Sequence, residues 1–196
     1  MNQIIYAEFI SFEELIRIIT RCNQQRGDHM QTKIKILMVC HGNICRSTMA
    51  QSVLNHMVTT RKIETNFYID SAATSREEIG NPPHYGTVNR LRQAGITVVP
   101  HRARQMTRQD YEAFDYLIGM DNANIRNMKC IAGGDEEEKL WKLLSFAAGD
   151  LTRQDRSEER RVAGRDVADP WYTGDFEATF RDVVRGCEGL IRYLGY

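Results

Sequence analysis

Short apolar runs alternate with segments of helical periodicity from Lys33 onward. Four runs have the length and composition of buried strands, and they cover residues 34–39, 67–70, 115–121 and 140–146. Strands separated by helical patterns are typical of crossover units, in which consecutive strands lie parallel in one sheet. The pattern therefore predicts an α/β domain over residues 33–196.

The helical segments carry recognisable start and stop signals. Apolar residues recur at helical spacing from Ala50 to Val58, directly after the first strand. A short helix over 88–94 is closed by Gly95, and an apolar stripe over 176–194 predicts a long C-terminal helix. Side chains suited to capping precede three helices, namely Thr107 with Asp110, Asp121, and Asp175.

Two segments depart from this rhythm. Residues 1–32 contain one isolated amphipathic pattern followed by a polar stretch, which predicts an N-terminal helical extension and linker ahead of the main domain, 33–196. The extension either packs on the domain or mediates association or targeting. Residues 150–166 are almost entirely polar, which favours a solvated loop, with a partner-docking surface as the alternative.

Composition narrows the classes of function. Lysine plus arginine (26) equals aspartate plus glutamate (26), so no global positive field attracts nucleic acid or an anionic membrane. The five cysteines form no even disulfide framework and no paired CxxC sets. Neither a secretory signal nor an 18-residue apolar span is present in the sequence, so we expect no membrane span and a cytoplasmic location in a reducing compartment.

The junction between the first strand and its helix, Cys40 to Ser47, has an unusual composition. A tight loop that opens a helix points several backbone N–H groups at one spot, with the positive end of the helix dipole behind them. Gly42 allows close approach of a bound group, and Asn43 tolerates positive φ. Arg46 adds a planar fork that suits two phosphate oxygens. The junction therefore predicts a binding loop for a tetrahedral oxyanion.

Cys40 lies at the mouth of this predicted loop. The N–H groups and the guanidinium of Arg46 favour its thiolate form, which is a nucleophile, and Ser47 can donate its hydroxyl to the sulfur. The spacing Cys-x5-Arg alone is weak evidence, because short motifs occur by chance. A merely structural cysteine, however, leaves Gly42 and Asn43 unexplained. We therefore expect a loop that binds phosphate and attacks it.

Transfer of a phosphoryl group to sulfur leaves an alkoxide or phenolate, and an acid must protonate that leaving group. Asp169 in "ADPWYTG" is the candidate, because Pro170 stiffens its loop and Trp171 and Tyr172 can wall a cleft beside it. The Asp-Pro pair alone is equally typical of an ordinary turn.

These motifs together resemble the low molecular weight protein tyrosine phosphatase family. "VCHGNICRS" (39–47) is similar to the family's phosphate loop, and "DPWY" (169–172) is similar to its acid loop Asp-Pro-Tyr-Tyr. "HRARQ" (101–105) and "FDYLIGMD" (114–121) resemble its central segments. The resemblance covers about residues 33–196. It implies a four-stranded parallel sheet flanked by helices, with the flavodoxin-like three-layer arrangement known as phosphotyrosine protein phosphatase I-like.

The resemblance also implies a set of roles. Cys40 becomes the nucleophile, Arg46 the phosphate clamp, and Asp169 the general acid and then the base for the hydrolytic water. The phosphate-binding loop consists of His41, Gly42, Asn43, Ile44, Cys45 and Arg46. Asn43 is expected to hold the loop through Ser71 and His101, with Ser47 supporting the sulfur. Cys45 forms a reversible disulfide with Cys40 under oxidation, and neither a metal nor an organic cofactor is implied.

The expected substrates are phosphotyrosine-containing proteins, with inorganic phosphate as product. Ile44, Trp171 and Tyr172 are expected to wall a slot that a phenyl ring can enter and that serine or threonine side chains are too short to fill. Glu77 occupies a rim position where the family often has an aromatic residue, and Trp171 replaces the first tyrosine of the acid loop.

Three other functions compete with this one. Arsenate reductase uses the same fold but needs further cysteines near the middle of the chain, and residues 46–129 contain none. Protein arginine phosphatases differ chiefly by threonine at the position of Ile44. A non-catalytic phosphotyrosine-binding module is expected to lose the nucleophile or the acid, and both Cys40 and Asp169 are present.

Overall fold

The computed structural model describes residues 33–154 and 156–196. Within them the strand order is β2-β1-β3-β4, and every neighbouring pair is parallel. The strands are β1 (Ile34–Cys40), β2 (Phe67–Ala73), β3 (Tyr116–Gly119) and β4 (Leu140–Lys142). The helices are α2 (Arg46–Thr60), α3 (Tyr85–Gln93), α4 (Arg108–Ala113), α5 (Asn122–Ala132), α6 (Glu158–Val162), α7 (Pro170–Thr173) and α8 (Phe176–Tyr193), with 3₁₀ turns η1 (Glu64–Asn66) and η2 (Leu143–Ala148). The predicted four-stranded parallel sheet is confirmed.

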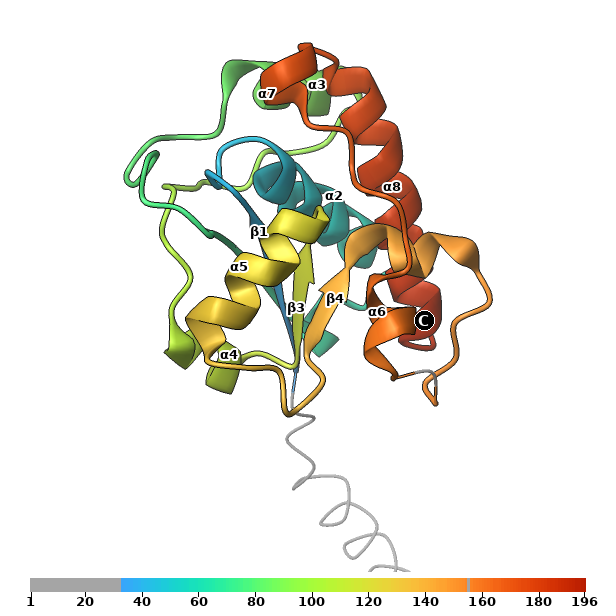
Figure 1. The fold of residues 1–196 in the computed structure, drawn as a ribbon. Helices are drawn as coiled ribbons and strands as arrows, with labels where there is room; N and C mark the ends of the chain where they lie inside the picture. Colours follow the sequence, from blue (N-terminus) through green and yellow to red (C-terminus); the bar gives the residue numbers. More distant parts are fainter. Residues whose placement is uncertain (1–32, 155) are drawn as a thin grey trace, which may run out of the picture. The chain divides into compact units, whose positions relative to one another are not determined.

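Side chains of β1 alternate between two apolar cores, because successive residues of a strand point to opposite faces. Ile36 and Met38 belong to the core built with α2 and α8, whereas Leu37 and Val39 belong to the core built with α4 and α5. Figure 1 shows these helix pairs on opposite faces of the sheet. The sheet is therefore the middle of three layers, and its strands read as continuous apolar runs because both faces are covered.

Several local signals in the sequence are confirmed. Thr107 and Asp110 form a reciprocal capping box at α4. Asp121 accepts a hydrogen bond from the backbone N–H of Asn124 at the start of α5, and Asp175 accepts one from Ala178 at the start of α8. Gly95 follows the last residues of α3 with φ of +70°. Caps are readable because they depend on residues only a few positions apart.

The fourth strand is shorter than predicted. Strand β4 ends at Lys142, and residues 143–148 form the 3₁₀ turn η2 instead of continuing to 146. Helix α8 approaches this turn so closely that a Cβ on Gly189 would lie 2.1 Å from the carbonyl oxygen of Phe146. The whole run is buried in either conformation, so its apolar character alone could not reveal where the strand ends.

The prediction of a wholly irregular polar loop over 150–166 is wrong in part, because it contains α6. Ser157 caps this helix, and the buried guanidinium of Arg161 pairs with the buried carboxylate of Asp135 and donates to the carbonyl oxygen of Leu140 at 2.7 Å. A helix that faces the protein with an arginine has no apolar stripe, so periodicity could not detect it.

Smaller differences concern two other helices. Helix α3 begins at Tyr85, three residues before the predicted start, and the Asp-Pro segment expected as a loop forms the single turn α7.

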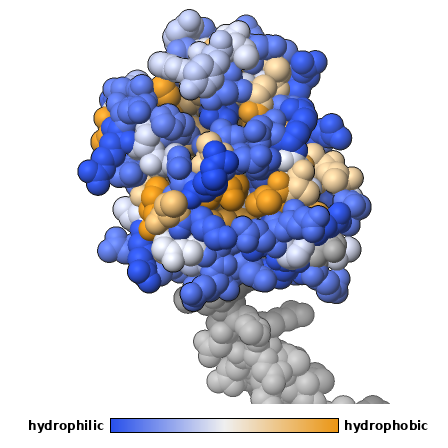
Figure 2. Space-filling model, in the orientation of Figure 1, coloured by the Kyte–Doolittle hydropathy of each residue, from blue (hydrophilic) through white to orange (hydrophobic). Residues whose placement is uncertain are grey.

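The predictions for residues 1–32 lie outside the described residues. No helix of the described part of the chain is long and apolar enough to cross a membrane. The face drawn in Figure 2 is mainly hydrophilic, with apolar residues in small patches.

Candidate active site

The segment from Cys40 to Arg46 connects β1 to α2 at the carboxyl edge of the sheet. Strands β2 and β3 lie on opposite sides of β1, so the chain reverses its direction of travel across the sheet at this edge. Open parallel sheets place ligand crevices at such switch points. The end of β3 accordingly brings Asp121 beside the segment, which we call the phosphate loop.

The sulfur of Cys40 receives two polar contacts inside the protein. The backbone N–H of Asn43 donates to Sγ at 3.2 Å, and the hydroxyl of Ser47 lies 3.1 Å away. The amide of Asn43 already donates to the Ser47 oxygen at 2.9 Å, so the Ser47 hydrogen is free to point at the sulfur. Both contacts stabilise negative charge on Cys40, which is only 3% exposed.

Asn43 is the residue that holds the loop in shape. Its φ is +58°, and it is completely buried. Its amide nitrogen also donates to Ser71 Oγ at 2.9 Å, while Oδ1 accepts from His101 Nε2 at 2.7 Å and from the Arg104 backbone at 3.2 Å. The left-handed conformation costs about 1 kcal/mol or more, and these hydrogen bonds offset that cost.

His101 therefore has a positioning role in the geometry. Because Asn43 Oδ1 can only accept, the proton must sit on Nε2 of the ring. Burial lowers the pKa of His101, the nearby Asp70 opposes this, and Arg104 adds to it. The ring is therefore expected to be neutral at neutral pH, with Nε2–H as donor.

Arg46 joins two carboxylates at the cavity. Its Nη1 lies 2.6 Å from Asp121 Oδ2, and its Nη2 lies 2.6 Å from Asp169 Oδ2. Burial alone would lower the pKa of Arg46, but the negative charges of Cys40, Asp169 and Asp121 outweigh it and raise that pKa. The guanidinium thus remains a fixed positive charge next to the Cys40 sulfur.

Asp169 is held by the helices around it. Its Oδ1 accepts from the Trp171 backbone at 3.1 Å and thereby caps α7. The preceding residue, Ala168, makes two backbone hydrogen bonds to side chains of α8. Its N–H donates to Asp182 at 3.0 Å, and its carbonyl oxygen accepts from Thr179 Oγ1 at 2.8 Å. Helix α8 therefore sets the position of Asp169.

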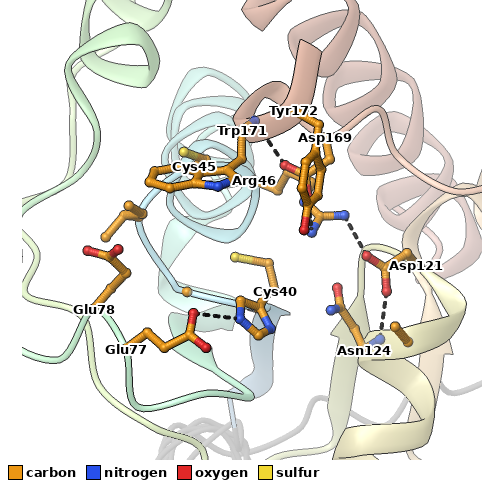
Figure 3. A pocket seen from close by; sticks show the side chains of 14 residues that line it. Cys40, Cys45, Arg46, Glu77, Glu78, Asp121, Asn124, Asp169, Trp171 and Tyr172 are labelled. Atoms are coloured by element: carbon orange, nitrogen blue, oxygen red, sulfur yellow. Dashed lines mark hydrogen bonds and ion pairs between the residues drawn. The ribbon is translucent and has the colours of Figure 1, made fainter. Parts of the chain in front are cut away.

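Most of the site residues predicted from the sequence line one cavity of about 310 Å³. Figure 3 shows Trp171 and Asp169 on the opposite side of this cavity from Glu77, with Cys40 between them. The cavity is lined by Cys40, His41, Gly42, Ile44, Cys45, Arg46, Glu77, Glu78, Asp121, Ala123, Asn124, Asp169, Trp171 and Tyr172. The other predicted residues, Asn43, Ser47, Ser71 and His101, lie behind the loop as its hydrogen-bonded support.

Two predicted residues behave differently from a simple phosphate cradle. Burial raises the pKa of Cys45 to about 12, with further contributions from the charges of Cys40 and Asp169, so this thiol is neutral at neutral pH. A Cβ on Gly42 would lie 3.1 Å from Cγ of Glu78. Packing against the cavity wall therefore adds a second reason for glycine at this position.

Sequence reasoning missed several residues of the site. Asp121 was expected only to cap a helix, yet it also binds Arg46. Glu78 lines the cavity, and Ser71 donates to Gln51 at 2.7 Å behind the loop. The position of Asp121 at the carboxyl end of a central strand was a usable signal. Thr179 and Asp182 offered a weaker one, as polar residues among the buried residues of an amphipathic helix.

Comparison with known proteins agrees with this geometry. Residues 35–195 match the family described as low molecular weight phosphotyrosine protein phosphatase. A relative from Bacillus subtilis (strain 168), named low molecular weight protein-tyrosine-phosphatase YfkJ, is 38% identical over 158 residues, which cover 81% of this chain and 94% of the relative. A Gallus gallus relative, named low molecular weight phosphotyrosine protein phosphatase, is also 38% identical over 158 residues, with coverage of 80% and 92%.

Two solved structures have a similar fold over most of this chain. The crystal structure of YfkJ from Bacillus subtilis has a TM-score of 0.72 and 37% identity, covering 83% of this chain and 95% of that one. The crystal structure of drosophila arginine phosphatase has a TM-score of 0.68 and 27% identity, covering 83% and 99%. The matched residues include the whole phosphate loop and all of α8. The chain belongs to the low molecular weight phosphotyrosine protein phosphatase family.

Proposed function

We propose that this protein hydrolyses phosphotyrosine in proteins through a cysteinyl-phosphate intermediate. One observation supports this above the others: Arg46 binds Asp169 at 2.6 Å while the Asn43 N–H and the Ser47 hydroxyl contact the Cys40 sulfur. A nucleophile, an anion clamp and a candidate acid thus line one cavity. This combination is what displacement at phosphorus on to sulfur requires.

In the first step, the Cys40 thiolate attacks phosphorus, the P–S bond forms and the P–O bond to the tyrosyl oxygen breaks. Asp169 in its protonated form gives its proton to that oxygen, so tyrosine leaves as a neutral phenol. The phosphate dianion competes with Asp169 for the guanidinium of Arg46. Substrate binding therefore releases the Asp169 carboxyl from Arg46 and makes it available to the leaving group.

In the second step, Asp169 as carboxylate takes a proton from water, and the resulting oxygen nucleophile attacks the phosphocysteine. The P–S bond breaks, inorganic phosphate leaves, and the electron pair returns to sulfur. The Ser47 hydroxyl, 3.1 Å from Cys40 Sγ, stabilises the departing thiolate. Residues of the described chain supply each proton transfer, and the thiolate is regenerated.

The walls of the cavity favour an aryl ester. Ile44 packs beside Cys45 and Ala103 and is 8% exposed, so it is a fixed apolar wall, and Trp171 stands above the cavity in Figure 3. A phenyl ring gains apolar contact there, while serine and threonine side chains are too short to carry phosphorus from the rim to the sulfur. A guanidinium gains less, because it loses hydration on entry.

The runner-up is a protein arginine phosphatase, which the likeness to drosophila arginine phosphatase keeps under consideration. The branched apolar Ile44 argues against it.

A cysteine nucleophile needs a reduced thiol, and the described cysteines, Cys40, Cys45, Cys130 and Cys187, are all free. We therefore place the enzyme in the cytoplasm, with phosphorylated proteins as partners.

The test is turnover of phosphotyrosine, phosphoserine and phosphoarginine peptides and of p-nitrophenyl phosphate by the wild type and Cys40→Ser. We expect efficient hydrolysis of phosphotyrosine, far slower hydrolysis of phosphoserine, and loss of all turnover in Cys40→Ser with phosphate binding retained. The exposed thiol variant Cys130→Ser serves as the matched control. Preference for phosphoarginine would favour the runner-up, and phosphate binding without turnover by the wild type would favour a non-catalytic module.

A further inference from the structure

A second hollow adjoins the active-site cavity on its Ile44 and Trp171 side. It is an open groove of about 640 Å³. Ile44, Glu78 and Trp171 line both spaces, and the groove continues along residues 81–85 to the outer face of α3, where it reaches Arg92. A chain that leaves the active site past Ile44 and Trp171 therefore enters this groove directly.

The floor of the groove is rigid and tied to the phosphate loop. The backbone N–H of His84 donates to the carbonyl oxygen of Ile44 at 2.8 Å. The His84 ring stacks on Phe176 with centroids 5.2 Å apart and an angle of 8°, and a Cβ on Gly86 would lie 2.3 Å from Phe176. Pro82 and Pro83 restrict the backbone before it. A ligand in the groove would therefore order little of the protein.

The walls combine exposed rings with a charge at each end. Trp171 is 60% exposed and Tyr85 is 73% exposed, so both present ring surface to a ligand. Figure 2 shows residues of intermediate hydropathy over α7, which carries Trp171. Aromatic and proline surfaces of this kind bind extended peptide segments at low entropic cost.

Charge distinguishes the two ends of the groove. Glu78 stands at the end nearest the active site, where its carboxylate accepts from Asn81 Nδ2 at 2.7 Å. Arg92 stands on α3 and is exposed, and among the residues described its side chain makes no ion pair or hydrogen bond. Its neighbour Arg90, by contrast, pairs with Glu177 at 2.5 Å and stacks on Phe180. Arg92 is therefore the cation that remains available to a ligand.

We propose that this groove binds the polypeptide on one flank of the substrate phosphotyrosine and selects an apolar residue next to it, followed by an acidic residue farther along. The apolar side chain rests on Trp171 and Tyr85, and the acidic side chain pairs with Arg92. Glu78 disfavours an acidic residue directly beside the phosphotyrosine. This proposal rests on the proposed function and adds a sequence preference to it.

The experiment compares phosphotyrosine peptides that differ in one flank. The parent peptide carries alanine on both sides, and the others carry leucine at the inner position and glutamate, alanine or lysine at successive outer positions, first on one flank and then on the other. Phosphate release by the full chain gives kcat/KM for each peptide. For the wild type we expect glutamate to exceed alanine by about two- to fivefold on one flank only, with the advantage shrinking as salt is added.

The variants assign that preference to the groove. Arg92→Gln is expected to remove the ratio between glutamate and alanine peptides, Arg92→Glu to invert it in favour of lysine, and Tyr85→Ala to reduce the leucine advantage. Arg61→Gln, an exposed arginine just past the far end of α2, is expected to keep the wild-type ratios. An unchanged glutamate preference in Arg92→Gln, or no flank preference in the wild type, would overturn the groove proposal.

Two activity measurements on the wild type distinguish failure of the groove proposal from failure of the proposed phosphatase function. Turnover of p-nitrophenyl phosphate and of the alanine peptide by the wild type reports the phosphatase reaction, because neither substrate offers the groove a selective side chain. If both substrates are hydrolysed but kcat/KM does not depend on the residues at either flank, only the groove proposal fails. If the alanine phosphotyrosine peptide is not hydrolysed at all, the proposed function fails and the groove proposal falls with it.

Discussion

The phosphate loop and the acid loop face each other across one cavity, but the protein holds them in different ways. Asn43 is completely buried, and its side chain binds four partners (Ser47, Ser71, His101 and Arg104), so the phosphate loop is fixed from within. Asp169 is held through Ala168, which binds α8, and is followed by Trp171 and Tyr172, which are 60% and 85% exposed. The proposed nucleophile is thus held from within its own loop, whereas the proposed acid depends on a neighbouring residue and on the packing of another helix.

After the loss of all turnover expected for Cys40→Ser, the largest expected effect comes from removing the acid while keeping its loop intact. Asparagine is a good N-cap, so Asp169→Asn keeps the acceptor for the Trp171 backbone but cannot donate a proton as an acid. We expect kcat/KM, which reports transfer of the phosphoryl group to Cys40, to fall by roughly 10² to 10⁴ for phenyl phosphates with poor leaving groups, and by much less for activated phenols. Steady-state rates across a series of leaving groups measure this, and equal losses across the series would contradict an acid role.

The attachment of the acid loop to α8 can be tested without touching the acid. Thr179→Val removes the hydroxyl that donates to Ala168 and keeps the shape of the side chain. We expect a roughly tenfold fall in kcat/KM that grows as the leaving group becomes poorer, because a displaced acid transfers its proton less well. Thr60→Val, at the exposed end of α2, is the matched control. A loss of activity of the same size for every leaving group would indicate general destabilisation instead.

The rate at which oxidised Cys40 forms a protective disulfide with Cys45 should depend on pH. Peroxide converts the Cys40 thiolate to sulfenic acid, and the Cys45 thiolate then attacks that sulfur, so that the S–S bond forms, the S–O bond breaks and hydroxide leaves. Because burial raises the pKa of Cys45 to about 12, its thiolate fraction increases with pH throughout the neutral range. Disulfide formation should therefore quicken by about tenfold per pH unit.

Quenched oxidation followed by mass measurement gives this rate. Cys45→Ser should convert reversible inactivation into permanent loss of activity, whereas Cys130→Ser should not. A rate of disulfide formation that does not change between pH 7 and pH 9 would argue against Cys45 as the attacking thiol.

The smallest expected effect concerns the exposed rim. The carboxylate of Glu77 lies 3.0 Å from His41 Nε2 and is largely solvated, so its influence on a substrate is weak and screened by salt. Glu77→Gln should raise kcat/KM by about twofold for phosphotyrosine peptides with an adjacent acidic residue, and only at low salt. The same comparison on peptides flanked by alanine provides the baseline, and a gain of equal size there would contradict a charge effect.

The sequence predicted the parts of the molecule that depend on near neighbours. Strand β1, the phosphate loop and the caps at Asp121 and Asp175 follow from residues a few positions apart. The end of β4 did not, because a buried apolar run looks the same as strand or turn. Helix α6 was hidden for the opposite reason, since a charged side chain, Arg161, faces its core.

The candidate site shows the same division. Motif spacing was enough to name Cys40, Arg46 and Asp169, but not the contact between Asp121 and Arg46, which are 75 residues apart. The support of the acid loop by Thr179 and Asp182 likewise depends on how α8 packs. Such contacts follow from the folded topology and have no local sequence signal.

Helix α8 places the acid loop and also completes the main core, because Val183, Leu190 and Ile191 are fully buried in the cluster that contains Met38. The proposed nucleophile therefore comes from the first strand of the sheet, and the proposed acid depends on α8, which follows all four strands in the chain. During synthesis, Cys40 is exposed to the cell before the helix that positions Asp169 exists. The proposed catalysis requires α8 to be docked, so activity would report that this helix is in place.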